Sequence, residues 1–358
     1  MKILIIGKFD AESFGNHISD GLSELGHTSI HFTKGIKYWH FKSPHLNRLN
    51  MIKLMGYQFY QSIPFLRNLE FNGLKKVLKE SNNSDIDLVI STHDFLTPSE
   101  VNYIKDVAKS PIVLWFPDAI VNFGKAMFLS APYDFLFFKD PYIVYVLKRE
   151  MNKNINYLPE CCNPNIHKLY KYSEQDKVKY SCEITTAGNF YSNRSVIFNQ
   201  LADYNFKMKI WGNPPPLWLD TKKIKKYLQG EYLVGSEKGK AFQLGKIVLN
   251  NLHPAEIWGI NCRAFEIPAL GGFQIISWRP GIDELFSLGH EIETYKTFGE
   301  LIEKIKFYLE NELERIKIIE SGHKKANDLH TYKNRVSEIL SIVFSNGDSF
   351  FNYNMKNI

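Results

Sequence analysis

Short apolar runs that end in polar residues recur along this chain and constrain its fold more than any other feature. The first is Lys2–Gly7, and two later runs, Asp87–Asp94 and Pro111–Asp118, end in His93-Asp94 and in Asp118. Apolar runs of this length, bounded by turn-forming residues, are typical of strands buried on both faces of a parallel sheet. Because parallel strands need helical crossovers, the sequence predicts an α/β protein.

The polar residues at the strand ends are candidate catalytic residues. In open α/β sheets, ligands bind beyond the carboxyl ends of the strands. His93, Asp94 and Asp118 are therefore expected to face a binding site, and Asp118 is favoured as a base. The structural alternative stays open for each of them, because an aspartate at a strand end often caps the next helix.

The N-terminal segment predicts a strand, a loop, a helix and a second strand. Ile18, Leu22 and Leu25 recur at helical spacing before Gly26, and the strand Thr28–Phe32 follows. Neither a G-x-G-x-x-G sequence after the first strand nor a phosphate-binding G-x-x-x-x-G-K-[ST] sequence is present. Their absence argues against a dinucleotide-dependent dehydrogenase and a P-loop nucleotidase.

A second strand–helix series restarts at Glu183 and places a domain boundary near residues 168–178. The expected domains are 1–170, 171–335 and a C-terminal helix and tail, 336–358, that packs back on the first domain. Within the second series, Gly188 and Asn189 end a strand, and Arg194 lies where the next helix begins. Backbone amides at a helix start together with an arginine are suited to a diphosphate. An exposed arginine on a loop is the alternative.

The stretch from Asn261 to Ile276 is predicted to form a short helix, a glycine stop and a buried strand. Phe265, Ala269 and Leu270 share one helical stripe, and Glu266 lies about 100° away. Gly271-Gly272 can end the helix and let the backbone approach a ligand. A longer helical run is expected from Phe298 to Leu329.

This stretch resembles the C-terminal signature of GT-B glycosyltransferases. The pattern Asn-x-Arg-x-Phe-Glu-x-Pro-Ala-x-Gly-Gly-Phe, which begins at Asn261, is most similar to the CgeB-like (spore maturation) branch. The resemblance implies two Rossmann-like, doubly wound domains that face a central cleft. It also implies that Glu266 holds the ribose of a nucleotide diphosphate sugar, and that cationic side chains rather than a metal stabilise the leaving diphosphate.

The resemblance assigns two further sets of residues. The donor-binding set is Glu266, Arg263, Asn261, Gly271, Gly272, Lys246, His253, Gly188, Asn189 and Arg194. An acceptor loop is expected at Asp10, Gly15 and His17. The chain departs from the pattern of many retaining enzymes, because Trp258 occupies the position of their second Glu and Glu256 is out of register. The stereochemistry therefore stays open.

Composition restricts the partners. With 358 residues and a net charge of +6, the chain is only mildly basic, which does not by itself indicate nucleic acid. The four cysteines lack the spacing of a metal site, and no run of about 18 apolar residues predicts a membrane span. Residues 37–67 mix basic and aromatic side chains. They are interpreted either as helices with solvated charges or as a surface for an anionic membrane.

Three functions remain in view. The leading prediction is a cytoplasmic, metal-independent glycosyltransferase of the hexosyltransferase type without a cofactor, in bacterial polysaccharide biosynthesis. It would use a nucleotide sugar such as a UDP-sugar and a carbohydrate or lipid-linked acceptor, at the inner face of the membrane if residues 37–67 contact lipid. A nucleotide-sugar 2-epimerase and a non-catalytic binding module are the alternatives on the same fold.

Overall fold

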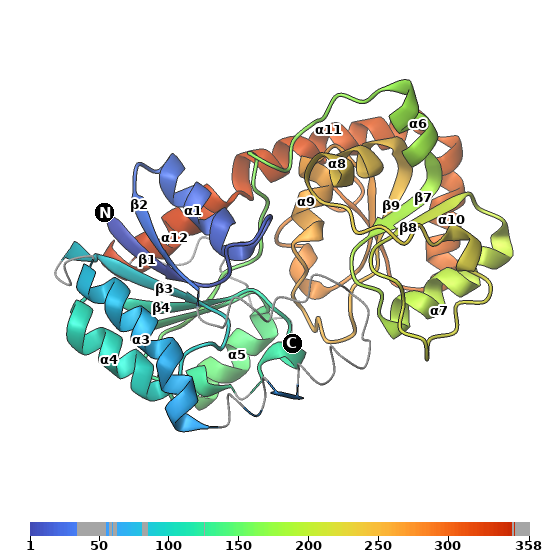
Figure 1. Ribbon diagram of the computed structural model, residues 1–358. Helices are drawn as coiled ribbons and strands as arrows, with labels where there is room; N and C mark the ends of the chain where they lie inside the picture. The colour runs from blue at the N-terminus through green and yellow to red at the C-terminus, as the bar shows by residue number, and fades with distance from the viewer. Residues whose placement is uncertain are drawn as a thin grey trace.

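The structure, a computed structural model, describes residues 1–33, 55–56, 59, 63–80, 85–124, 126–345 and 347. These residues form two lobes, each built around a parallel sheet (Figure 1). The strands of the first sheet run in the order β2-β1-β3-β4-β5-β6. Their bounds are β1 (Lys2–Ile6), β2 (Thr28–Phe32), β3 (Leu88–Thr92), β4 (Ile112–Phe116), β5 (Phe135–Phe138) and β6 (Ile155–Tyr157).

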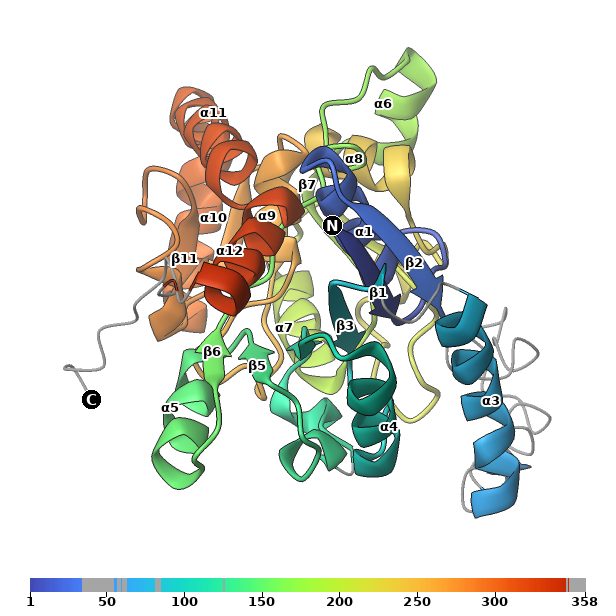
Figure 2. The ribbon, with the colours of Figure 1, turned by 90° about the vertical axis from the view of Figure 1, so that its left-hand side faces the viewer.

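Both faces of the first sheet are covered by helices, as the unbroken apolar strands require. Leu4 and Ile6 of β1 pack in one core with α3 (Pro64–Glu80), α4 (Pro98–Ala108) and α5 (Pro141–Glu150). Ile3 and Ile5, which alternate with them, pack in another core with α1 (Phe14–Glu24) and α12 (Tyr332–Ser345). Figure 2 shows these two groups of helices on opposite sides of the sheet.

The helix α12 comes from the far end of the chain and completes the first domain. Its side chains Tyr332, Val336, Ile339 and Ile342 are buried against the sheet and α1. In Figure 1 the red helix α12 lies beside the blue helix α1. One face of the N-terminal sheet therefore depends on residues that follow the whole C-terminal domain.

The second domain has a sheet of order β11-β10-β9-β7-β8. Its strands are β7 (Cys182–Ala187), β8 (Met208–Trp211), β9 (Gly245–Asn250), β10 (Gln274–Ser277) and β11 (Glu293–Tyr295). Its helices are α6 (Glu174–Tyr180), α7 (Ser192–Leu201), α8 (Gly235–Leu244), α9 (Arg263–Ala269), α10 (Phe298–Glu310) and α11 (Glu312–Leu329). Short 3-10 turns are η3 (Ile120–Asn122), η4 (Met127–Leu129), η5 (Ala202–Tyr204), η6 (Lys225–Tyr227) and η7 (Pro280–Ile282).

The chain crosses between the domains at two adjacent segments. Cys162 lies where the chain leaves the first domain and forms an isolated parallel β-bridge, through backbone hydrogen bonds, with Thr331, where the chain returns. Arg335 is 1% exposed and fastens both segments: its Nε donates to the carbonyl oxygen of Pro159, and its Nη2 lies 2.8 Å from Nδ1 of His330. A buried guanidinium with several acceptors is held in one orientation. The two crossings therefore form one connection.

The predicted α/β class, with two Rossmann-like domains, is confirmed by the two parallel sheets and their covering helices. The single helical run predicted over Phe298–Leu329 is wrong in one detail. It is interrupted at Asn311, whose φ of −108° and ψ of 75° are not helical, so that α10 and α11 are separate helices. Most of the basic aromatic segment 37–67 and most of the tail 346–358 lie outside the described residues.

Candidate functional site

A cavity of about 280 Å³ lies between the two domains. Asp118, Lys139 and Glu160 line it from the first domain, where they follow β4, β5 and β6. Its remaining lining includes Asn189, Arg194, Asn251, His253, Glu256, Asn261 and Arg263 from the second domain. The carboxyl ends of both sheets therefore face this cavity, which is the position expected of a ligand site in such folds.

Two arginines form the positive end of the cavity. Arg194, in the first turn of α7, is 1% exposed; its Nε donates to Oδ1 of Asn251 (3.1 Å) and its Nη1 to the carbonyl oxygen of Asn189 (2.9 Å). Burial and the nearby guanidinium of Arg263 lower the pKa of Arg194 to about 9. Within the described part of the chain, no carboxylate forms an ion pair with either arginine. Two neighbouring cations with which no described carboxylate forms a direct ion pair are suited to an anion.

Gly188 brings the two guanidinium groups together. β7 ends at Ala187, and Gly188 takes a φ of +120°, a conformation that favours glycine. A Cβ on Gly188 would lie 2.2 Å from Nη1 of Arg263 and 3.9 Å from Nη1 of Arg194. Arg263 also donates from Nη1 to the carbonyl oxygen of Ala187 (3.2 Å). Its Nε is buried and has no hydrogen-bond partner among the described residues, so it can still donate to a ligand.

Carboxylates surround Lys139 at the other end of the cavity. Its Nζ lies 2.8 Å from Oε1 of Glu256 and 3.9 Å from Oε1 of Glu160, and all three residues are buried. Burial raises the pKa of Glu160 to about 8, against the opposing effect of Lys139. Burial alone would lower the pKa of Lys139, but the two carboxylates hold it above its ordinary value. Oε2 of Glu256 and Nδ2 of Asn251 have no hydrogen-bond partner among the described residues.

Asp118 and His93 are brought together, with His93 Nε2 lying 3.4 Å from Oδ2 of Asp118. Burial would raise the pKa of Asp118, but the hydrogen bond and charge of His93 hold it below its usual range. His93 has a left-handed backbone (φ of +60°), and its Nδ1 is buried without a described partner. Strained backbone of this kind is common at functional sites. For Asp94 the capping alternative holds, because its carboxylate accepts from the amides of Met127 and Phe128.

Glu266 lies one helical turn after Arg263 on α9 and is 9% exposed. Its Oε2 lies 3.4 Å from Nζ of Lys238, and its Oε1 lies 3.6 Å from Nε2 of His167. Burial opposes ionisation, but Lys238, followed by His167, lowers the pKa of Glu266 to about 2. The carboxylate is therefore charged over the whole physiological range.

Some of the predicted donor residues lie at the cavity and others do not. Asn189, Asn261 and His253 line it with the two arginines. Gly271 and Gly272 lie at the opposite end of α9 from Arg263, where a Cβ on Gly271 would meet Leu169 and one on Gly272 would meet Ile267. Lys246 is exposed near the amino end of β9, whereas the cavity lies beyond its carboxyl end.

The predicted acceptor loop lies at the domain boundary. Asp10 is exposed, and its carbonyl oxygen accepts from Nδ2 of Asn16. Gly15 is buried, and a Cβ there would meet the carbonyl oxygen of Lys8 at 2.5 Å. His17 is 4% exposed and bonds to Nδ2 of Asn163 (2.9 Å). These three residues do not line the charged cavity.

Sequence reasoning missed several charged residues of this region. Lys139 and Glu160 follow strands, so the rule that selected Asp118 would also have found them. Lys238, inside α8, and Glu12, in the loop after β1, carry no such signal, because only the packing of the domains brings them to Glu266. The described residues contain no group of three or more His, Cys, Asp or Glu side chains that could hold a metal ion.

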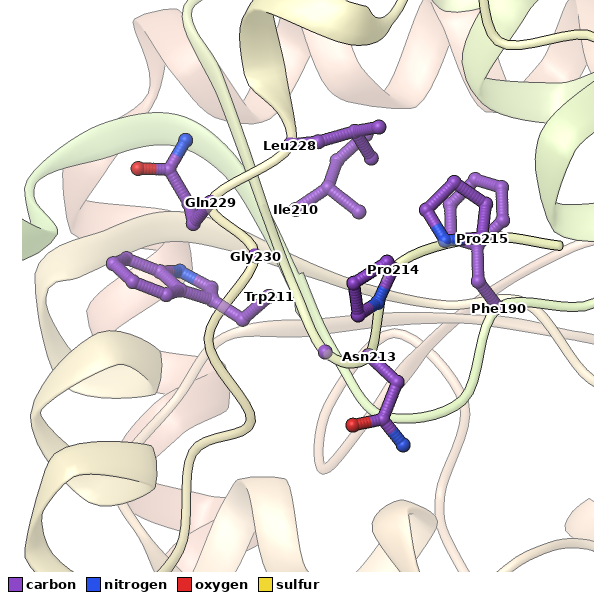
Figure 3. Close-up of a pocket in the computed structure, with 10 residues that line it drawn as sticks. Phe190, Ile210, Trp211, Asn213, Pro214, Pro215, Leu228, Gln229 and Gly230 are labelled. Carbon is purple, nitrogen blue, oxygen red and sulfur yellow. The ribbon is translucent and has the colours of Figure 1, made fainter. Parts of the chain in front are cut away.

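A second pocket, of about 150 Å³, lies beyond β8 and differs in chemistry (Figure 3). Trp211, Pro214 and Leu228 are among its lining residues, none of which is charged. The amides of Gln229 and Asn213 point away from Ile210 and Pro214 in this view. Because the interdomain cavity alone combines paired cations with carboxylates among the pockets described here, it is the candidate active site.

Comparisons with known proteins agree with this fold. The model of a family described as "Glycosyl transferase-like" matches residues 194–341, a segment that includes Arg194, Arg263 and Glu266. No curated protein sequence matches the chain. Among the searched helices of the described residues, none is long and apolar enough to cross a membrane.

Solved structures match nearly the whole chain at low identity. Sucrose-phosphate synthase from Thermosynechococcus elongatus aligns with a TM-score of 0.64 and 10% identity, over 97% of this chain and 100% of that one. Anabaena Alr3699/HepE, solved with UDP and glucose, aligns with a TM-score of 0.61 and 12% identity, over 96% and 100%. A putative UDP-N-acetylglucosamine 2-epimerase from Listeria monocytogenes aligns with a TM-score of 0.56 and 11% identity, over 97% of both chains. The chain thus has the GT-B fold.

Proposed function

We propose that this protein transfers a hexosyl group from a nucleotide diphosphate sugar, with UDP as the nucleotide, to an acceptor hydroxyl. The observation that carries the proposal is the pair Arg194 and Arg263 at the carboxyl ends of the strands, where Arg194 is buried and neither arginine forms an ion pair with a described carboxylate. The family match to residues 194–341 and the UDP-bound structure of HepE support this class of donor.

The diphosphate would bind at Gly188. Both guanidinium groups converge there, and Arg263 retains an unused Nε donor. Desolvating Arg194 without a counter-charge is costly, and a bound diphosphate would offset that cost with charge-assisted hydrogen bonds. The same two cations would stabilise the negative charge that develops on the leaving diphosphate in the transition state. The reaction proposed here needs no metal ion.

The nucleoside and the sugar would extend in opposite directions from the diphosphate. One helical turn along α9, Glu266 offers carboxylate oxygens to the ribose hydroxyls. Beside Arg194, Nδ2 of Asn251 can donate to a sugar hydroxyl, and beside Lys139, Oε2 of Glu256 can accept from one. A buried donor or acceptor without a hydrogen bond destabilises the protein by its desolvation cost. The hydroxyl groups of a sugar could form those hydrogen bonds and remove that cost.

For an inverting transfer, Asp118 would act as the base and His93 would orient it. Asp118 lines the cavity and retains its negative charge, and Nε2 of His93 lies 3.4 Å from its Oδ2. The acceptor oxygen would form a bond to the anomeric carbon, and its proton would pass to Asp118. The bond between that carbon and the phosphate oxygen would break, and the electron pair would leave with the diphosphate.

Calorimetry with UDP, UDP-glucose, GDP, dTDP and CMP tests the proposal. The parent protein should bind at least one uridine ligand most tightly, and Arg263→Met should weaken that binding by roughly ten- to a hundredfold, since hydrogen bonds to charged groups contribute about 1.5–3 kcal/mol. Lys246→Met removes an exposed cation at the far end of β9 and should leave the affinity unchanged. Equal losses in both variants, or no nucleotide binding by the parent, would refute the proposed site.

The 2-epimerase remains the second candidate, because the putative epimerase from Listeria monocytogenes shares the fold. Incubation with a UDP-sugar in the absence of an acceptor separates the two reactions. An epimerised nucleotide sugar would replace the transferase proposal, whereas transfer to an added acceptor would support it. A non-catalytic binding module would bind the donor and turn over neither.

We extend the proposal to a CgeB-like enzyme of bacterial polysaccharide biosynthesis that works in the cytoplasm, with residues 37–67 at the inner face of the membrane. Its support is the sequence pattern at Asn261–Phe273 and the basic aromatic composition of that segment. Flotation with phosphatidylglycerol vesicles should carry the parent upward. A variant with alanine at Lys37, Lys42 and Lys53 should remain at the bottom of the gradient, and equal flotation of both would remove the membrane role.

A further inference from the structure

We infer that Lys238 is a positioning residue for the donor site: it fixes the Glu266 carboxylate for the ribose and, through Glu12, ties it to the N-terminal domain. The inference rests on the proposed nucleotide site. It concerns a residue on α8, outside the stretch that suggested Glu266 and outside the lining of the charged cavity.

Lys238 lies between two carboxylates that come from different domains. Its Nζ is 2.7 Å from Oε2 of Glu12, in the loop after β1, and 3.4 Å from Oε2 of Glu266, on α9. The three side chains are between 11% and 14% exposed. An ammonium group this far from water needs anionic partners, and removing it would leave two buried carboxylates close together.

His167 lies beside the other oxygen of Glu266. The backbone amide of Asn163 donates to Nδ1 of His167 (3.0 Å), so Nδ1 must accept and the proton of the neutral ring lies on Nε2. That Nε2 faces Oε1 of Glu266 at 3.6 Å. Lys238 therefore holds one oxygen of the carboxylate, the ring of His167 lies beside both Lys238 Nζ (3.4 Å) and the other oxygen, and each oxygen keeps a lone pair for a hydroxyl. The carboxylate is preorganised for a vicinal diol before any ligand binds.

Glu12 extends this arrangement across the domain boundary. Its backbone is left-handed (φ of +55°), and its Oε1 accepts from the amide of Gly235 at the start of α8. Glu12 also lines an open groove of about 570 Å³ with Asn16, Asn165 and Tyr170. A ligand that changes the position or charge of Glu266 thus acts, through Lys238, on a contact made by the first domain. Nucleotide binding and the interdomain contact are coupled by linkage.

The coupling predicts a change in pH dependence that a purely structural lysine would not give. Without Lys238, burial would raise the pKa of Glu266, because Lys238 is the largest of the influences that lower it. Among the described residues, the other charged or titratable groups around Glu266 and Lys238 include His17 on α1, His167, Glu160, Cys162, Glu12, Tyr170, Tyr232, Arg263, Cys262 and Tyr332. Burial is the largest cause that lowers the pKa of both histidines, and it persists without Lys238, so at pH 7 neither histidine is expected to replace the lost charge.

The experiment measures UDP affinity by calorimetry between pH 5 and pH 8. In the parent, Glu266 stays ionised between pH 5 and pH 8, so its titration should not change the affinity for UDP in this range. Lys238→Met should bind UDP at least tenfold more weakly at pH 7 and lose further affinity toward pH 5, as Glu266 takes up a proton. Lys240→Met is the matched control, because Lys240 lies two residues along α8 and pairs with Asp176 instead (3.0 Å). It should follow the parent at every pH.

Inorganic pyrophosphate is the second probe, since it has no ribose and should bind the parent and Lys238→Met alike. Lys238→Gln keeps a donor without the charge and replaces Lys238→Met if that variant does not fold; the same pH dependence is expected. A parent-like pH profile in the folded variant would overturn the inference if Glu266→Gln still weakens UDP binding. If Glu266→Gln also binds UDP like the parent, or the parent binds no UDP, the proposed ribose site fails first and this inference with it.

Discussion

Replacing Glu266 by Gln should weaken nucleotide binding by about one to two orders of magnitude while the fold is kept. Gln has nearly the volume of Glu and retains one oxygen acceptor, but it loses the charge and one of the two acceptors. Lys238 contacts one oxygen of Glu266 and His167 lies beside the other, so both oxygens face protein groups in this site and the lost acceptor is one that a ribose hydroxyl would use. Hydrogen bonds to charged groups contribute about 1.5–3 kcal/mol, which corresponds to roughly ten- to a hundredfold in Kd.

The same substitution should lower stability only moderately. The pKa of Glu266 is depressed from 4.5 to about 2, which corresponds to roughly 3 kcal/mol of stabilisation that is present above pH 4.5 and is lost as the pH falls to 2. The uncharged amide of the Glu266→Gln variant would forgo that contribution at neutral pH. Lys238 would keep its shorter contact with Glu12 (2.7 Å), so the substitution would not leave a buried ammonium group without an anionic partner.

Calorimetry with UDP and thermal unfolding together separate the two effects. The matched control is Glu293→Gln, since Glu293 on β11 is also buried (7% exposed) but pairs with Lys304 (2.9 Å) instead of Lys238. The control should lower the melting temperature without changing the Kd for UDP. Unchanged UDP affinity in Glu266→Gln, or an equal loss in Glu293→Gln, would refute the assignment of the ribose to Glu266.

Three further outcomes follow from the structure. Asp118→Asn should reduce kcat by about a hundredfold or more with little change in donor Kd, as expected for a base; a kcat near that of the parent would remove Asp118 from the catalytic residues. Gly188→Ala should weaken UDP binding, since the new Cβ would lie 2.2 Å from Nη1 of Arg263. Parent-like affinity by calorimetry would contradict the proposed binding of the diphosphate at Gly188. Val336→Asp would bury an unpaired charge at a position that is 0% exposed and should cost about 3 kcal/mol or more in urea unfolding; a loss below about 1 kcal/mol would contradict the role of α12.

The fold was predictable because the apolar strands are distinct in this sequence. β2 begins and ends at the predicted residues, and the other predicted strands differ mainly at their polar ends. These polar ends lie beyond the last hydrogen-bonded residues of the strands and extend toward the site. The strand predicted from the sequence is therefore longer than the observed strand. The interruption at Asn311 was missed because the apolar and charged periodicity continues on both sides of it.

The candidate site was predictable where position along a strand determines position in space. His93 with Asp118 and Arg194 with Arg263 come together because parallel strands end at one edge. Lys246 is on β9, the strand that Asn251 and His253 follow, but it lies near the amino end of β9, whereas those two residues lie beyond its carboxyl end at the cavity. The cation near Glu266 is instead Lys238. Only the packing of α8 against α9 and the first domain brings it there, and one sequence cannot supply that information.

The position of α12 has a consequence for the order in which the protein can mature on the ribosome. A chain is synthesised from its N-terminus, and domains generally fold as they emerge. The first sheet cannot complete its packing until the last helix has been synthesised. Ile3, Ile5 and Val113 lack the helix that completes their core before Tyr332–Ser345 emerge. The domain synthesised first is therefore finished last. A chain that stops at Leu329 would present an open apolar face to chaperones and proteases, so quality control can distinguish an incomplete copy from a complete one.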